Sequence, residues 1–237
     1  MFLPDAALSE FLTFAAVGAL AQLVDGALGM AYGVASAAML LGLGLPPAVA
    51  SASVHYAEAF TCGASGLSHL CAGNVRRRLL WRLAIPGVLG AVLGAAVVSH
   101  LPAAWMRLAL TPYLLLMGLM LLQRGLRGGR PASNAIAGGG WSALTVTTLV
   151  ARGAEPRTVI GTVHLAKCMV SAAASVSFLL QLGTTHGAAV PGLIAGGVLA
   201  APFGALLARR LPARAATLLA ATAVLTLGLH NGLGALR

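Results

Sequence analysis

The sequence predicts an all-α polytopic membrane protein with inverted repeats, about seven transmembrane helices and two re-entrant broken-helix hairpins. Composition is the first observation behind this fold class, because 59% of the 237 residues are hydrophobic and only 8% are charged. Soluble domains carry about 25% charged residues. The mean hydropathy is +0.91, and several apolar stretches reach the ~20 residues that a helix needs to cross a bilayer. We therefore expect a single membrane domain, residues 1–237, with no separate soluble domain.

An internal repeat is the second observation. Residues 25–61 align with residues 134–170 without a gap, at an offset of 109 residues. Further along, residues 87–102 align with residues 197–212 once the offset has grown by one. A duplicated unit in an apolar chain is typical of a transporter whose binding site lies between the repeats. The chain accordingly divides into an extra first helix (1–24), repeat 1 (25–123) and repeat 2 (134–233).

The basic residues are the third observation. The net charge is +10, which in a soluble protein would suggest nucleic acid as a partner. No basic patch with interleaved aromatic side chains is present, so we expect no nucleic-acid partner. The positive-inside rule, which enriches cytoplasmic loops of membrane proteins in arginine and lysine, explains the charge more simply.

Each predicted helix coincides with one apolar stretch of the sequence. Proline stands near the first helical position of four of them, at Pro47, Pro102, Pro156 and Pro212, where its missing N–H has no helical partner anyway. Tyr113 lies near a predicted span end and is interpreted as an interface anchor. In chain order, the predicted spans are 6–24, 47–72, 79–99, 102–123, 156–182, 188–209 and 212–233.

Two further apolar stretches, 25–45 and 134–151, begin with glycines. If both crossed the membrane, the arginines at 76–78 and 209–210 would lie on opposite sides. As re-entrant hairpins they leave seven crossings, with the N-terminus inside and nearly all arginines cytoplasmic. Each repeat then has three crossings, an odd number, so the repeats are inverted and their hairpins meet near the midplane. The alternative is that these glycines serve only helix packing.

A charge deep inside a predicted span costs about 2.5–3.5 kcal/mol and therefore needs a reason. His55 and Glu58 are three residues apart and share a helix face. His164 and Lys167 stand at the equivalent positions, so Glu58 is expected opposite Lys167. Lys167, the histidines and bare N–H groups at the hairpin tips would suit an oxyanion. The candidate substrate-binding residues are His55, Glu58, His164, Lys167, Gly29, Gly138, Gly139, Gly140, Asp25 and Asn134.

Other readings of these residues stay open. Glu58 and Lys167 could form a pair that only locks the bundle, with the histidines bonded to backbone carbonyls. A metal-ion permease would use His55, Glu58 and Cys62 at i, i+3 and i+7, although soft-metal sites more often show paired Cys or His. A membrane scaffold without transport is a third reading. We expect no enzyme, cofactor or disulfide framework, because no nucleophile–base pair, cofactor motif or CxxC pair is present.

Five stretches carry a family resemblance: DGALGMAYG (25–33), LPPAVASASVHYAEAFTCGASGLSHLCAGNV (45–75), AGGGW (137–141), EPRTVIGTVHLAK (155–167) and GVLAAPFGALLARRLPAR (197–214). In these stretches the chain resembles the sulfite exporter TauE/SafE family of membrane permeases. The resemblance implies a multi-pass protein of the bacterial inner membrane that exports sulfite or organosulfonates. The family pattern often has an acidic residue where this chain has Asn134 and Lys167. Those differences make the central site more positive, which favours an anion.

The expected partners are a small anionic substrate and the lipid bilayer. Protons are a candidate coupling ion, and a homodimer is a candidate assembly. Because the cell interior is negative, moving one anionic charge outward across 100 mV is favourable by about 2.3 kcal/mol. Export therefore needs no obligatory proton, whereas uptake would need coupling.

Overall fold

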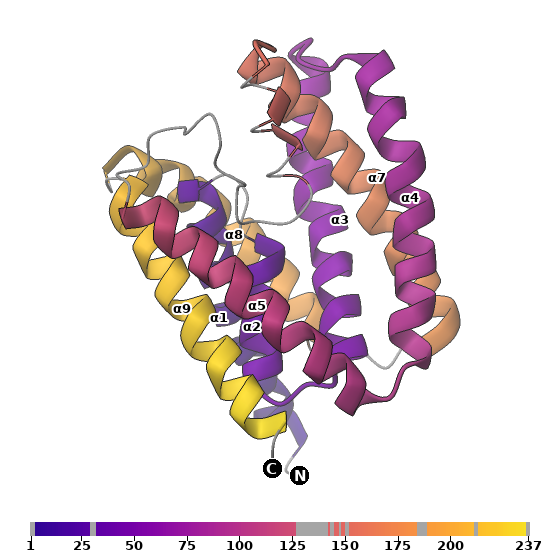
Figure 1. Cartoon of the computed structure of the whole chain (residues 1–237), viewed down its shortest axis with the longest axis vertical. Coiled ribbons are helices and arrows are strands. Elements are labelled where there is room, and N and C mark those ends of the chain that lie inside the picture. Colours follow the sequence, from indigo (N-terminus) through magenta and orange to yellow (C-terminus); the bar gives the residue numbers. More distant parts are fainter. Residues whose placement is uncertain are drawn as a thin grey trace.

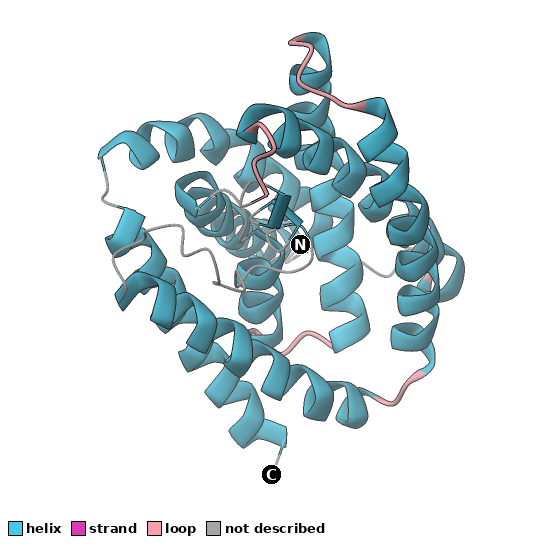
Figure 2. Cartoon of the chain, turned by 45° about the horizontal axis from the view of Figure 1, so that its top comes forward, coloured by secondary structure: helices cyan, strands magenta, loops and turns pink. Residues whose placement is uncertain are grey.

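A computed structural model describes residues 3–28, 32–126, 142, 145–146, 148–149, 152–183, 189–210 and 213–235 of the chain. These residues form helices and short connections, and no strand occurs among them (Figure 2). All seven predicted spans are helical, and a further short helix, α2, lies in the first predicted hairpin. The helices are α1 (Leu3–Leu28), α2 (Tyr32–Gly42), α3 (Pro47–Cys71), α4 (Arg77–His100), α5 (Ala103–Leu126), α7 (Pro156–Leu182), α8 (Ala189–Arg210) and α9 (Ala213–Ala235).

Proline and glycine set the ends of α3 and α7, the two helices that carry the candidate site. They begin at Pro47 and Pro156, as the missing N–H allows. Gly73 follows α3 and Gly183 follows α7, with φ angles of 72° and 67° in the left-handed region that glycine enters without a steric penalty. The two helices contain 25 and 27 residues. At 1.5 Å per residue, each is long enough to cross the ~30 Å hydrocarbon core of a bilayer.

The helices form two groups that lie side by side (Figure 1). One group consists of α3, α4 and α7, and the other of α1, α2, α5, α8 and α9. The most extensive contacts join α1 to α8, α5 to α9 and α3 to α7. Helix α3 also contacts α2, α5 and α8, and so it connects the groups. The largest cluster of buried apolar side chains lies in the second group and reaches α3 at Ala50, Val54 and Ala57.

Two of these pairs bring together helices from equivalent positions of the two predicted repeats. Helices α3 and α7 are antiparallel, since Gly66 lies against Leu165 while His55 lies against Ser171. Opposite directions at equivalent positions agree with an inverted arrangement. Helices α5 and α9 are also antiparallel, with close approaches between Gly125 and Leu218, Gly118 and Leu225, and Gly232 and Thr111.

The first predicted hairpin, 25–45, is wrong at its start. Helix α1 continues through residues 25–28, because a single glycine there costs a helix only about 1 kcal/mol. Helix α2 has 11 residues, about 16 Å, which is too short to cross a bilayer alone. It begins beside Glu58, at the middle of α3, and its Leu41 lines the same cavity as Pro47. Helix α2 therefore extends from the middle of α3 to the end of the bundle where α3 begins.

The second predicted hairpin, 134–151, is described at five of its residues. Residues 142, 145, 146, 148 and 149 are all helical. The remainder of this stretch, which includes Asn134 and the glycines at 138–140, lies outside the described residues.

The ends of the chain also correct the predicted topology. Figure 1 shows the start of α1, the end of α9 and the connection between α4 and α5 at the lower end of the molecule. Seven crossings would place the two chain ends on opposite sides, and the chain returns to the lower end between α1 and α3 instead of turning back on its own side. The arginine-rich connection between α3 and α4 lies at the upper end. The predicted N-terminus on the arginine side is therefore wrong as well.

Several helices have the length and surface of membrane spans. Among the described residues, three helical segments are long and apolar enough to cross a bilayer by length and composition: α4, Ala103–Gln123 of α5 and Arg157–Leu182 of α7. In α4 only Leu80, Ala84 and Ala95 are buried, while Leu89 and Leu93 are 61% and 67% exposed. An apolar helix with so exposed a surface suits contact with lipid.

Candidate functional site

One ion pair is present within the described part of the chain, and it joins the two central helices. Lys167 Nζ on α7 lies 2.7 Å from Glu58 Oε1 on α3, with side chains 15% and 5% exposed. The repeat offset predicted this opposition. Buried charges are tolerated when they are paired, but a buried pair by itself is weak evidence for a stabilising role. The surroundings of the pair therefore decide what it can do.

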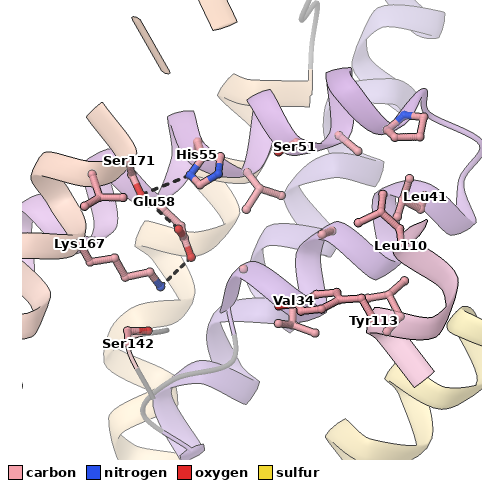
Figure 3. A pocket seen from close by; sticks show the side chains of 17 residues that line it. Val34, Leu41, Ser51, His55, Glu58, Leu110, Tyr113, Ser142, Lys167 and Ser171 are labelled. Carbon is pink, nitrogen blue, oxygen red and sulfur yellow. Dashed lines mark hydrogen bonds and ion pairs between the residues drawn. The ribbon is translucent and has the colours of Figure 1, made fainter. Parts of the chain in front are cut away.

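Two side chains contact the Glu58 carboxylate (Figure 3), which also lies against the start of α2. Lys167 contacts Oε1, and the Ser171 hydroxyl donates to Oε2 at 3.2 Å. Because the single Ser171 proton goes to the carboxylate, its oxygen accepts from His55 Nδ1 at 3.5 Å. In the first turn of α2, a Cβ on Gly33 would stand 2.7 Å from Oε1. Only glycine allows this approach, and the first turn of a helix presents unpaired N–H groups and partial positive charge.

A cavity of about 240 Å³, cavity A, lies on one side of the pair. Tyr113 lines it from within α5 (Figure 3); its predicted place at an interface is therefore wrong. Tyr113 lies near the middle of Ala103–Leu126, as it does in the predicted span 102–123, so it was wrongly assigned to a span end. The other lining residues are Gly33, Val34, Ala37, Leu41, Pro47, Ala50, Ser51, Val54, His55, Glu58, Leu110, Leu114, Ser142, Lys167, Val170 and Ser171.

A second cavity of about 90 Å³, cavity B, is also lined by Lys167. Both cavities are much larger than the ~10–15 Å³ that one water needs. Lys167 and Ser142 line both of them, whereas Glu58 lines cavity A. Cavity B is lined by Gln22, Tyr32, Thr61, Cys62, Ser65, Ser142, Val146, Val163, His164 and Lys167.

Seven lining residues of cavity A correspond to seven of cavity B at the repeat offset of 109. The two halves of the sequence thus contribute equivalent positions to two spaces that meet at Lys167. The matched residues, cavity A first, are Gly33 and Ser142, Ala37 and Val146, Val54 and Val163, His55 and His164, Glu58 and Lys167, Val170 and Thr61, and Ser171 and Cys62.

The histidines show the same correspondence in their ring contacts. His55 stacks on Phe178 with centroids 6.1 Å apart and an interplanar angle of 24°. His164 stacks on His69 with the same separation and angle, and His69 is the offset partner of Phe178. The hydrogen bonds differ, however. His164 Nδ1 lies 3.0 Å from the carbonyl of Ile160 in its own helix, and because a carbonyl only accepts, this nitrogen carries a proton.

The predicted site residues divide into three sets. His55, Glu58 and Lys167 line cavity A. His164 lines cavity B, which Lys167 also lines. Ser142 was missed, although the repeat offset applied to Gly33 points to it. The structure does not describe the side chain of Asp25 or any part of Gly29, Asn134, Gly138, Gly139 and Gly140.

The predicted metal ligands do not gather. His55 and Glu58 line cavity A, whereas Cys62 lines cavity B. Within the described ranges, no group of three His, Cys, Asp or Glu side chains could hold a metal ion. The ligand set proposed from the i, i+3, i+7 spacing therefore finds no support here.

Known membrane proteins match most of this sequence. Residues 14–231 match the sulfite exporter TauE/SafE family. The chain belongs to this family. It is 40% identical over 228 residues to the probable membrane transporter protein YtnM of Bacillus subtilis (strain 168), with 86% of this chain and 76% of the relative covered. No solved structure gives a significant match. The family and the relative both indicate a membrane transporter rather than an enzyme.

Proposed function

We propose that the protein is a multi-pass permease that exports a small sulfur-containing oxyanion, sulfite or an organosulfonate, across the bacterial inner membrane. The substrate site is the space around Glu58 and Lys167, between inverted repeats at 25–123 and 134–233. The family description supports sulfite as the substrate class, and the relative's name supports transport. The antiparallel pairing of α3 with α7 supports the inverted arrangement.

One observation carries the proposal: Lys167 lines both cavities. An anion bound to its ammonium group would therefore border both spaces and could pass from one to the other without leaving the cation. Charge-assisted hydrogen bonds are about twice as strong as neutral ones, and the buried setting strengthens them further. A scaffold without transport would not need two cavities that share one buried cation.

The Glu58 carboxylate marks how an oxyanion would bind. Its two oxygens take up Lys167 Nζ and the Ser171 hydroxyl, which are the kinds of donor that a sulfite or sulfonate group would use. We infer that Glu58 keeps Lys167 charged while the site is empty and that the substrate displaces it. A proton bound to Glu58 would remove the competing charge and give protons a route to influence transport.

Membrane voltage favours the export direction. Each anionic charge that leaves a cell across 100 mV gains about 2.3 kcal/mol. The arginines at the α3–α4 connection would also raise the local anion concentration at the cytoplasmic mouth, an effect that salt screens.

Inside-out membrane vesicles with labelled anions test the proposal. We expect saturable flux of sulfite or of a sulfonate such as methanesulfonate, and no flux of a divalent metal cation. Phosphate and sulfate serve as size and charge controls for the same cavity. If the inserted protein moved none of the sulfur anions, the proposed function would be wrong.

A further inference from the structure

A third cavity lies at the arginine-rich end of α4 and α7, away from the ion pair. Its volume is about 450 Å³, and three arginines line it: Arg76, Arg78 and Arg82. Among the described lining residues, Glu155 is the only acidic one. The remaining described lining residues are Gly73, Leu79, Leu149, Ala154, Thr158 and Val159.

The three guanidinium groups lack an acidic partner within the described part of the chain, where the one ion pair within 4.0 Å is that of Glu58 and Lys167. Glu155 is engaged elsewhere, since its Oε2 accepts the hydroxyl of Thr158 at 2.9 Å. Arg82 stands five residues after the start of α4 at Arg77, about 7.5 Å along the helix. A charge that lies this far into a membrane helix needs a counter-charge or a path to the interface.

An apolar groove of about 260 Å³ adjoins this cavity along α4, and none of its exposed lining surface is polar. Arg78, Arg82, Ile85 and Leu89 follow one another at i, i+4, i+7 and i+11, which places them in one stripe on the helix surface. The basic cavity and the groove are thus two parts of one stripe. The groove is lined by Trp81, Ala84, Ile85, Val88, Leu89 and Met169.

We propose that this stripe binds an anionic phospholipid, with its phosphate among Arg76, Arg78 and Arg82 and one acyl chain in the groove. A soluble phosphate would satisfy the arginines and leave the groove uncovered. A zwitterionic lipid would fill the groove but bring its own ammonium group against three guanidinium groups. Basic pockets between helices on the cytoplasmic side favour anionic headgroups, so the combination of charge and apolar surface selects this class.

Native mass spectrometry of the purified protein with phosphatidylglycerol or phosphatidylcholine tests the headgroup site. We expect bound phosphatidylglycerol on the wild type and about thirtyfold weaker binding in Arg78→Gln/Arg82→Gln, since each basic residue near a membrane surface contributes roughly a fivefold preference. Arg77→Gln is the matched control: Arg77 is exposed on the same turn but lines neither space. Equal binding of the two lipids, or equal loss in Arg77→Gln, would overturn the proposal.

Trp81 reports on the acyl chain, because it lines the groove and is 52% exposed. In a Trp105→Phe/Trp141→Phe background, phosphatidylglycerol with brominated chains is expected to quench Trp81 more than brominated phosphatidylcholine does. The Arg78→Gln/Arg82→Gln change is expected to remove this difference. If millimolar inorganic phosphate abolished the preference for phosphatidylglycerol, and if the two brominated lipids quenched Trp81 equally, the site would bind a soluble anion. The proposal would then be wrong.

Discussion

Cavity A and cavity B are built from equivalent positions of the sequence, yet their chemistry differs. In cavity A, Ser171 bonds to the Glu58 carboxylate and accepts from His55. In cavity B, Cys62 stands at the position of Ser171, and His164 bonds to its own helix. Cavity A is also the larger, at about 240 Å³ against about 90 Å³. At these matched positions the side chains differ, and only those of cavity A contact a carboxylate.

Removing Lys167, the cation that lines both cavities, should have the largest effect on anion flux. We predict that Lys167→Ala lowers anion flux about tenfold to 150-fold, because the hydrogen bonds of a charged group are worth about 1.5–3 kcal/mol and its charge balances the substrate. The measurement is flux of labelled sulfite in proteoliposomes at equal protein content. Wild-type flux in the variant would rule out the role of Lys167.

A companion variant separates function from folding in that experiment. Leaving Glu58 unpaired costs about 3–5 kcal/mol of stability, whereas replacing both charges with neutral groups is often close to neutral. Glu58→Gln/Lys167→Met should therefore melt near the wild type in detergent and still fail to transport. If this double variant transported the anion, the pair would be only a structural lock.

Neutralising Glu58, the acidic member of the pair, should sharpen the comparison of the two cavities, because it removes the group that competes with the substrate for Lys167. In Glu58→Gln we expect the KM for the anion to fall about fivefold, since a neutral amide binds Lys167 about 1 kcal/mol less tightly than a carboxylate. Flux measured with and without a pH gradient then tests coupling: a wild type that responds and a variant that does not would place the proton on Glu58. A higher KM in Glu58→Gln would contradict the idea of a competing carboxylate.

The close approach of α2 to Glu58 can be tested at one glycine. Gly33→Ala would put a Cβ 2.7 Å from Glu58 Oε1, and such overpacking costs about 1–3 kcal/mol. We expect a lower melting temperature and reduced flux. Gly94→Ala in α4 is the matched control, because a Cβ there meets nothing within 4 Å. Equal behaviour of the two variants would show that α2 does not hold the carboxylate.

The sequence predicted these features unevenly, for physical reasons. Prolines at 47 and 156 mark helix starts locally, and the offset of 109 places Glu58 opposite Lys167 because a duplicated frame preserves position. We predicted that the first helix ends before residue 25, because a glycine next to Asp25 is typical of a turn. Helix α1 nevertheless continues through residue 28, since one glycine costs a helix little. Cavities and their shared residues depend on distances between helices. No periodicity in a single helix reports those distances.

The smallest expected effect concerns the hydroxyl that distinguishes cavity A from cavity B. Ser171→Ala removes the hydrogen bond to Glu58 Oε2, and a typical bond of this kind contributes about 0.5–1.5 kcal/mol. We therefore expect flux to fall between about twofold and tenfold, with the protein still folded. Ser175→Ala is the matched control, because Ser175 donates to the Ser171 backbone carbonyl one turn away and lines neither cavity. Cys62→Ser gives cavity B the same hydroxyl and should change flux less than Ser171→Ala does; a larger effect at Cys62 would mean that cavity B, not cavity A, sets the rate.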